Sequence, residues 1–164
     1  MEFVTKEAVL KILRDKGIPF EVTEHPAVYT IEEMEAAGLP HSGDICKNLF
    51  LRDAKGKRHF LVSLEKDKRA DLGRLAELLG CGKLSFASEE RLGRLLGLRR
   101  GAVTPLGVLN DEDCAVELVF DRDLASHPRL GVHPCDNTAT VWLAPADLER
   151  LAAEKGNPVC WLDL

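Results

Sequence analysis

Two apolar runs joined by a short polar segment constrain the fold of this chain more than any other feature. Residues 48–52 and 59–64 form mostly apolar runs, and the Asp53-Ala54-Lys55-Gly56-Lys57 segment between them has the length and the glycine of a hairpin connection. Segments with helical spacing flank this pair, without the regular alternation of strand and helix seen in parallel α/β folds. The sequence therefore predicts one domain over residues 1–164, of mixed α/β (α+β) class, in which helices surround a single mixed and mostly antiparallel sheet.

Capping residues, glycines and apolar spacing give the remaining elements. Thr5, Thr30 and Ser88 can each cap the start of a helix, and glycines follow the expected ends. Helices are expected at residues 5–16, 30–38, 72–79, 89–96 and 145–155. Further strands are expected at residues 20–23, 84–86, 116–120, 138–143 and 159–162.

Composition narrows the class of protein. The 164 residues are 45% apolar, but no apolar run approaches the roughly 20 residues needed to span a bilayer, and the N-terminal residues do not resemble a signal peptide. A cytoplasmic location without membrane contact is expected. The five cysteines are odd in number and lack Cys-x-x-Cys spacing, so free thiols are expected instead of a metal site.

The charge distribution is uneven. The net charge is −5, yet residues 47–101 carry 14 Lys and Arg against 7 Asp and Glu. A local basic face matters more than the net charge for binding phosphates, although solvated helix faces often have the same composition. The sequence therefore leaves a nucleic-acid partner open.

Three segments contain polar groups where plain secondary structure would not need them. Lys47 opens an apolar run, and a buried ammonium is costly unless an anion or a strongly polar group meets it, although the lysine could also extend to water. The Gly101-Ala102-Val103-Thr104-Pro105 loop allows backbone groups to approach a small ligand. Another apolar run is preceded by the polar residues His133, Asn137, Thr138 and Thr140, which suit either recognition of an amino group and an ester or a hydrogen-bonded corner.

Taken in this order, the segments resemble the YbaK/ProX family of aminoacyl-tRNA deacylases, free-standing relatives of the prolyl-tRNA synthetase editing domain. The resemblance covers nearly the whole chain from His25-Pro26 onward. It is carried by Lys-Asn-Leu-Phe-Leu at 47–51, Gly-x-x-x-Pro at 101–105 and His-Pro-x-x-Asn-Thr-Ala-Thr at 133–140. Ala27 and Leu106 depart from the residues common in relatives.

The resemblance implies hydrolysis of an ester on mischarged proline tRNA, most closely that of alanine, without a cofactor or metal. Lys47 is then the catalytic residue, residues 101–105 form the substrate loop, and His133, Asn137 and Thr138 line the amino-acid pocket. The tRNA acceptor stem and 3′ end are the expected partners, with prolyl-tRNA synthetase as a further candidate. Cations expected to contact the tRNA are Lys66, Lys68, Arg69, Arg74, Arg91 and Arg94.

Three alternatives stay open at this point. The same reaction could remove cysteine, serine or threonine instead of alanine. The chain could also be a non-catalytic module that binds tRNA ends or a synthetase, because a fold does not determine a function. Finally, Cys46 or Cys135 could act as a thiolate nucleophile.

Overall fold

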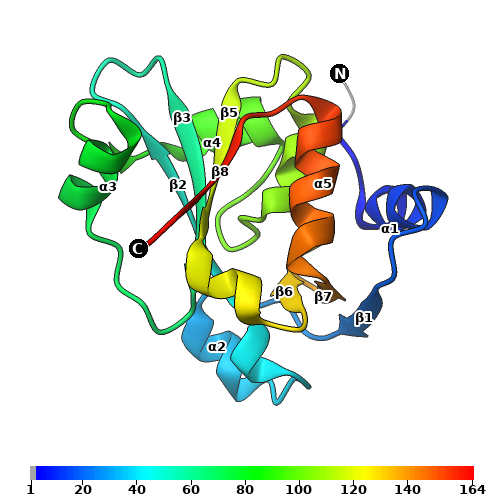
Figure 1. The fold of residues 1–164 in the computed structure, drawn as a ribbon. Helices are drawn as coiled ribbons and strands as arrows, with labels where there is room; N and C mark the ends of the chain where they lie inside the picture. The colour runs from blue at the N-terminus through cyan, green and yellow to red at the C-terminus, as the bar shows by residue number, and fades with distance from the viewer. Residues whose placement is uncertain (1–2) are drawn as a thin grey trace.

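The computed structural model describes residues 3–164 as one mixed α/β domain (Figure 1). The α-helices are α1 Lys6–Asp15, α2 Ile31–Ala36, α3 Leu72–Leu79, α4 Glu89–Leu96 and α5 Pro145–Lys155. The strands are β1 Glu21–Glu24, β2 Cys46–Arg52, β3 His59–Glu65, β4 Ser85–Phe86, β5 Val116–Asp121, β6 Leu130–Val132, β7 Ala139–Leu143 and β8 Val159–Leu162. Three short 3-10 helices are η1 Ser42–Asp44, η2 Pro105–Asn110 and η3 Arg122–Ser126.

The predicted fold class is confirmed, but the prediction of a single sheet is wrong. Five strands form one sheet in the order β4-β2-β3-β5-β8, and three form a second sheet in the order β1-β7-β6. Four of the six strand pairs are antiparallel, and the pairs β3-β5 and β5-β8 are parallel. An isolated bridge between Ile45 and Gly131 joins the edges of the two sheets.

The central strand β3 is buried from His59 to Leu64 and mostly apolar, because both faces of the larger sheet are covered. Leu61 packs into a core with α1, α4, α5 and the smaller sheet, whereas its neighbours Phe60 and Val62 pack against α3. Figure 1 shows α3 on one side of this sheet and α4 and α5 on the other. The period of two along β3 therefore separates two cores.

Local signals place the helix ends as expected. The Thr5, Thr30 and Ser88 hydroxyls each accept a hydrogen bond from the backbone N–H three residues later. Gly80 and Gly97 end α3 and α4 in the left-handed conformation, with φ of 65° and 63°. None of the helices in residues 3–164 is long and apolar enough to cross a bilayer.

The smaller sheet depends on a close contact between Gly131 and Trp142, which face each other in the β6-β7 register. A Cβ added to Gly131 would lie 2.4 Å from Cζ3 of Trp142, whose side chain is buried. We expect Gly131→Ala to lower the free energy of unfolding by about 1–3 kcal/mol through overpacking, as measured by urea denaturation. Gly82→Ala is the matched control, since a Cβ there meets nothing within 4 Å. Equal stability of the two variants would contradict the close packing.

Candidate active site

A pocket of about 170 Å³ lies where α2, the start of β2, the 101–103 loop and the smaller sheet meet. It is lined by residues 28–31, Met34, 46–48, Gly101 with Val103, 131–133 and Thr140. The first half of β2 has an open edge here, because β4 pairs with β2 only at Leu51 and Arg52. The fold thus brings together the three segments that the sequence distinguishes.

Lys47 lines this pocket and is half-buried. Its Nζ donates a hydrogen bond to the backbone carbonyl of Lys68, in the segment that follows β3. An ammonium group has three N–H donors, so two remain after this bond. The carbonyl of Lys68 therefore holds the ammonium in place and leaves it donors for a ligand.

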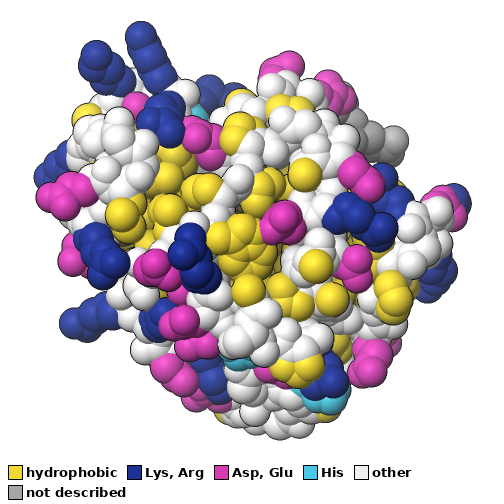
Figure 2. Space-filling view, viewed as in Figure 1, with side chains coloured by type: hydrophobic (Ala, Val, Ile, Leu, Met, Phe, Trp, Pro, Cys, Tyr) yellow, Lys and Arg dark blue, Asp and Glu magenta, His cyan; other side chains and the backbone are white. Residues whose placement is uncertain are grey.

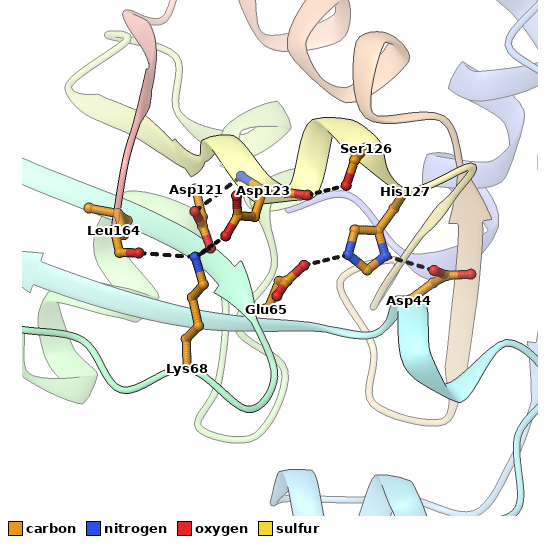
Figure 3. Close-up of polar contacts among 8 residues, drawn as sticks. All are labelled: Asp44, Glu65, Lys68, Asp121, Asp123, Ser126, His127 and Leu164. Carbon is orange, nitrogen blue, oxygen red and sulfur yellow. Dashed lines mark hydrogen bonds and ion pairs between the residues drawn. The ribbon is translucent and has the colours of Figure 1, made fainter.

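Ion pairs hold the 65–68 segment at both ends (Figure 3). The Nζ of Lys68 lies 2.8 Å from Oδ2 of Asp121 and 2.6 Å from Oδ2 of Asp123, and it donates to a main-chain oxygen of Leu164. At the other end, Glu65 accepts a hydrogen bond from Nε2 of His127 at 2.7 Å.

The second ring nitrogen of His127 donates to Asp44, also at 2.7 Å. Burial alone would lower the pKa of His127, but the hydrogen bonds to Glu65 and Asp44 outweigh it and raise the pKa. A histidine between two carboxylates is favoured in the doubly protonated form, with both ring nitrogens as donors. This charge fixes the end of β3 against η1, which precedes Lys47.

Asn48, the next residue of β2, supplies a second donor to the lining of the pocket. Its Oδ1 accepts a hydrogen bond from the buried Ser63 hydroxyl at 2.6 Å, across the β2-β3 register. With Oδ1 engaged, the Nδ2 amide is the group left to donate. Strand β2 therefore contributes two donors to the pocket lining, called the donor wall below, and they suit a carbonyl oxygen or an oxyanion.

The residues that the smaller sheet contributes to the pocket lining, called the acceptor wall below, provide acceptors. Nδ1 of His133 donates to the carbonyl of Ala139 at 2.9 Å, which leaves Nε2 with a free lone pair in the neutral ring. Burial lowers the pKa of His133, so the ring is neutral at pH 7.

Thr140 adds a second acceptor, because its hydroxyl hydrogen is engaged by His25. Nδ1 of His25 lies 2.9 Å from the carbonyl of Pro26, so Nδ1 carries the proton and Nε2 accepts from the Thr140 hydroxyl at 2.9 Å. The lone pairs of Thr140 Oγ1 are then free to accept. One wall of the pocket donates and the other accepts, which is the complement of a group that carries both a carbonyl and an ammonium.

Only part of the expected substrate loop lines the pocket. Gly101 and Val103 line the pocket, whereas Ala102 is buried outside it. Thr104 is also buried and caps η2 by accepting from the backbone N–H of Leu106, and Pro105 begins η2. The first residues of the Gly-x-x-x-Pro segment thus contribute to the pocket wall, whereas its last two residues begin the helix η2.

The two other residues expected to line the pocket stabilise its frame instead. Asn137 donates from Nδ2 to the carbonyl of Val28 at 2.8 Å, and the Thr138 hydroxyl donates to Asp136 at 2.5 Å. Neither is among the residues that line the pocket. Asn137 attaches the 136–138 turn to the segment before α2, and Thr138 stabilises the turn itself. The expectation that both side chains line the pocket is therefore corrected.

Sequence reasoning missed Tyr29 and Asn48 as residues of the pocket, although each lies in a segment that the sequence distinguishes. Asn48 directly follows Lys47, and only the bond to Ser63 shows which way its amide faces. The contact between His25 and Thr140 spans 115 positions of the chain. A single sequence carries no signal for such a pairing.

Among the cations expected to contact tRNA, Lys68 is not supported, because Asp121 and Asp123 already pair with its ammonium. Lys66 pairs with Glu35 of α2 at 3.2 Å, and Arg91 donates to the carbonyl of Gly56. Arg69, Arg74 and Arg94 are exposed, Arg94 lying 3.9 Å from Glu90. Figure 2 shows Lys and Arg side chains gathered over the β2-β3 hairpin and α3.

Thiol chemistry is disfavoured by the surroundings of both candidate cysteines. Burial raises the pKa of the Cys46 thiol far above its usual value, and Asp44 and Glu65 add to the effect. Burial also raises the pKa of Cys135 to about 12. A reactive thiol needs a lowered pKa, so neither group is suited to act as a nucleophile at neutral pH.

The fold and the pocket can now be compared with those of known proteins. A family model described as the aminoacyl-tRNA editing domain matches residues 25–151, and the chain belongs to this family. It is 49% identical over 157 residues to the prolyl-tRNA editing protein ProX of Acetoanaerobium sticklandii, covering 96% of each chain. It is 40% identical to prolyl-tRNA synthetase associated domain-containing protein 1 of Danio rerio, covering 88% of this chain and 79% of that one.

A solved structure of a candidate trans-editing enzyme for prolyl tRNA synthetase has the same fold. It superimposes with a TM-score of 0.71 at 28% identity and covers 98% of both chains. Because the similarity extends over nearly the full length of each chain, the pocket described above is formed within the shared fold.

The ion pairs at Lys68 lead to a stability prediction. Lys68→Met leaves the Asp121 carboxylate, whose side chain is 1% exposed, without a cation. We expect the free energy of unfolding to fall by about 3–5 kcal/mol, with partial recovery when Asp121→Asn is added, as measured by urea denaturation. Lys11→Met is the control, because its pair with Asp15 is exposed and contributes less than about 1 kcal/mol. Unchanged stability of Lys68→Met would mean that its ammonium is available for other partners.

Proposed function

We propose that this chain is a trans-editing deacylase that hydrolyses the ester between an amino acid and mischarged proline tRNA, with alanine as the amino acid removed. The observation that carries the proposal is the division of the pocket into a donor wall and an acceptor wall. An aminoacyl ester has a carbonyl that accepts and an α-ammonium that donates, on adjacent carbons. The names of the ProX and prolyl-tRNA synthetase associated relatives support proline tRNA as the carrier.

In the proposed reaction, the Lys47 ammonium and the Asn48 amide bind the ester carbonyl and stabilise the oxyanion that forms when water attacks. The free Nε2 of His133 and Oγ1 of Thr140 accept from the α-ammonium and set the direction of the ester. Water adds to the carbonyl carbon, the bond to the ribose oxygen breaks, and the proton released by water passes to that oxygen by way of the neighbouring ribose hydroxyl. Esters are activated, so positioning and charge stabilisation supply most of the rate.

The size of the pocket supports a small amino acid. Its volume of about 170 Å³ must hold the aminoacyl group together with the attacking water. Ile31, Met34 and Val103 form apolar walls around this space. A rigid apolar wall rejects a larger side chain by steric clash more readily than it rejects a smaller one, which favours alanine over proline.

Deacylation of proline tRNA charged separately with alanine, cysteine, serine and proline tests the proposal. We expect rapid loss of alanine and slow loss of proline. Lys47→Ala and Asn48→Ala should each lower kcat by about 10²- to 10³-fold, as expected for removal of an oxyanion donor. Lys11→Ala, an exposed change on α1, should leave the rate unchanged. Preference for cysteine or serine would change the substrate, and tRNA binding without hydrolysis would indicate a non-catalytic module.

The exposed cations beside the pocket lead to a salt prediction. Arg99 and Arg100 directly precede Gly101 and are exposed, so they can reach the phosphates of the bound 3′ end. We expect the affinity for tRNA to fall as salt rises. Replacing both arginines with glutamine should reduce the slope of log K against log salt by about 0.7–0.9 for each phosphate that the protein no longer neutralises. A slope unchanged from wild type would remove these arginines from the tRNA interface.

A further inference from the structure

Tyr29 is the one tyrosine of the chain, and it lies at the rim of the pocket with 63% of its surface exposed. Four other large hydrophobic side chains in residues 3–164 are also exposed, and none of these lines the pocket. An aromatic ring left in water beside a ligand pocket offers apolar surface that a ligand can cover.

Two contacts fix the position of Tyr29. Its backbone N–H donates to Oε2 of Glu33 at 2.9 Å, at the capped start of α2. The ring lies against Gly101, which has φ of 86°, and a Cβ at that glycine would be 2.7 Å from Cδ1 of Tyr29. The glycine therefore makes room for the ring. A side chain held in this way loses little conformational freedom when a ligand covers it.

The proposed substrate, an aminoacyl-tRNA 3′ end, contains a group that can cover the ring. We propose that Tyr29 is the stacking platform for the unpaired terminal adenine of the tRNA 3′ end; this rests on the proposed function and adds a base subsite to it. When the aminoacyl group fills a pocket of about 170 Å³, the ribose and its base must lie at the rim. Unpaired bases are commonly bound by stacking on aromatic side chains. Arg99 and Arg100 directly precede Gly101 and are exposed, so they are available to the adjoining phosphate.

The single tyrosine allows a test that does not need hydrolysis. Protein labelled with 3-fluorotyrosine gives one ¹⁹F resonance, from Tyr29 alone. We expect this resonance to shift in a saturable way with the trinucleotide CCA and to stay in place with ribose 5-phosphate, which lacks a base. A shift with alanine methyl ester but none with CCA would overturn the inference, because Tyr29 would then belong to the amino-acid wall. Absence of a shift with CCA would overturn it as well.

Kinetics give a second test with a matched control. Tyr29→Ala should raise KM for the mischarged tRNA by roughly 10- to 100-fold, the effect expected for loss of one base stack, and change kcat little. Tyr29→Phe should restore KM, since stacking needs the ring and not the hydroxyl. Phe86→Ala removes an aromatic that is also 63% exposed but does not line the pocket, and it should leave KM unchanged.

The failure of the inference differs from the failure of the proposed function. If wild type hydrolyses the ester and Tyr29→Ala has the same KM, the base subsite is wrong and the deacylase proposal stands. If CCA shifts the ¹⁹F resonance but no charged tRNA is hydrolysed, the stacking platform stands and the deacylase proposal fails.

Discussion

The hydrogen bond from Lys47 to the carbonyl of Lys68 is the interaction on which the site depends. A lysine at the start of a buried strand needs a polar partner, and here the partner is a backbone oxygen instead of a carboxylate. A neutral acceptor fixes the ammonium without cancelling its charge, so the charge remains available for a ligand. The ion pairs of Lys68 and His127 hold the two ends of the 65–68 segment and thereby keep that oxygen in place.

Much of the fold could be predicted because its signals are local. Helix caps such as Thr30 and Ser88, and the bounds of β8 and α5, follow from neighbours within a few positions. The division into two sheets could not be predicted, because alternation tells which face of a strand is buried and not which strand it pairs with. Strand β6 has only three residues, and its pairing depends on how Gly131 fits against Trp142.

The site was predictable in part for a similar reason. Lys47, Gly101 and His133 stand out because each has an unusual property at its own position, and all three line the pocket. Asn137 and Thr138 look equally polar in the sequence, but their hydrogen bonds are made to the frame. Whether a polar group is free or engaged depends on partners far away in the chain, which composition and spacing do not reveal.

The two walls of the pocket belong to different sheets. Lys47 and Asn48 are on β2 of the larger sheet, whereas His133 directly follows β6 and Thr140 lies on β7 of the smaller one. The backbone bridge between Ile45 and Gly131 joins the sheets beside this pocket. A ligand held by both walls therefore acts as a cross-link between two layers of the domain. Occupancy should slow amide hydrogen exchange in β6 and β7 beyond the residues that the ligand touches, because opening of the small sheet would require the ligand to be released first.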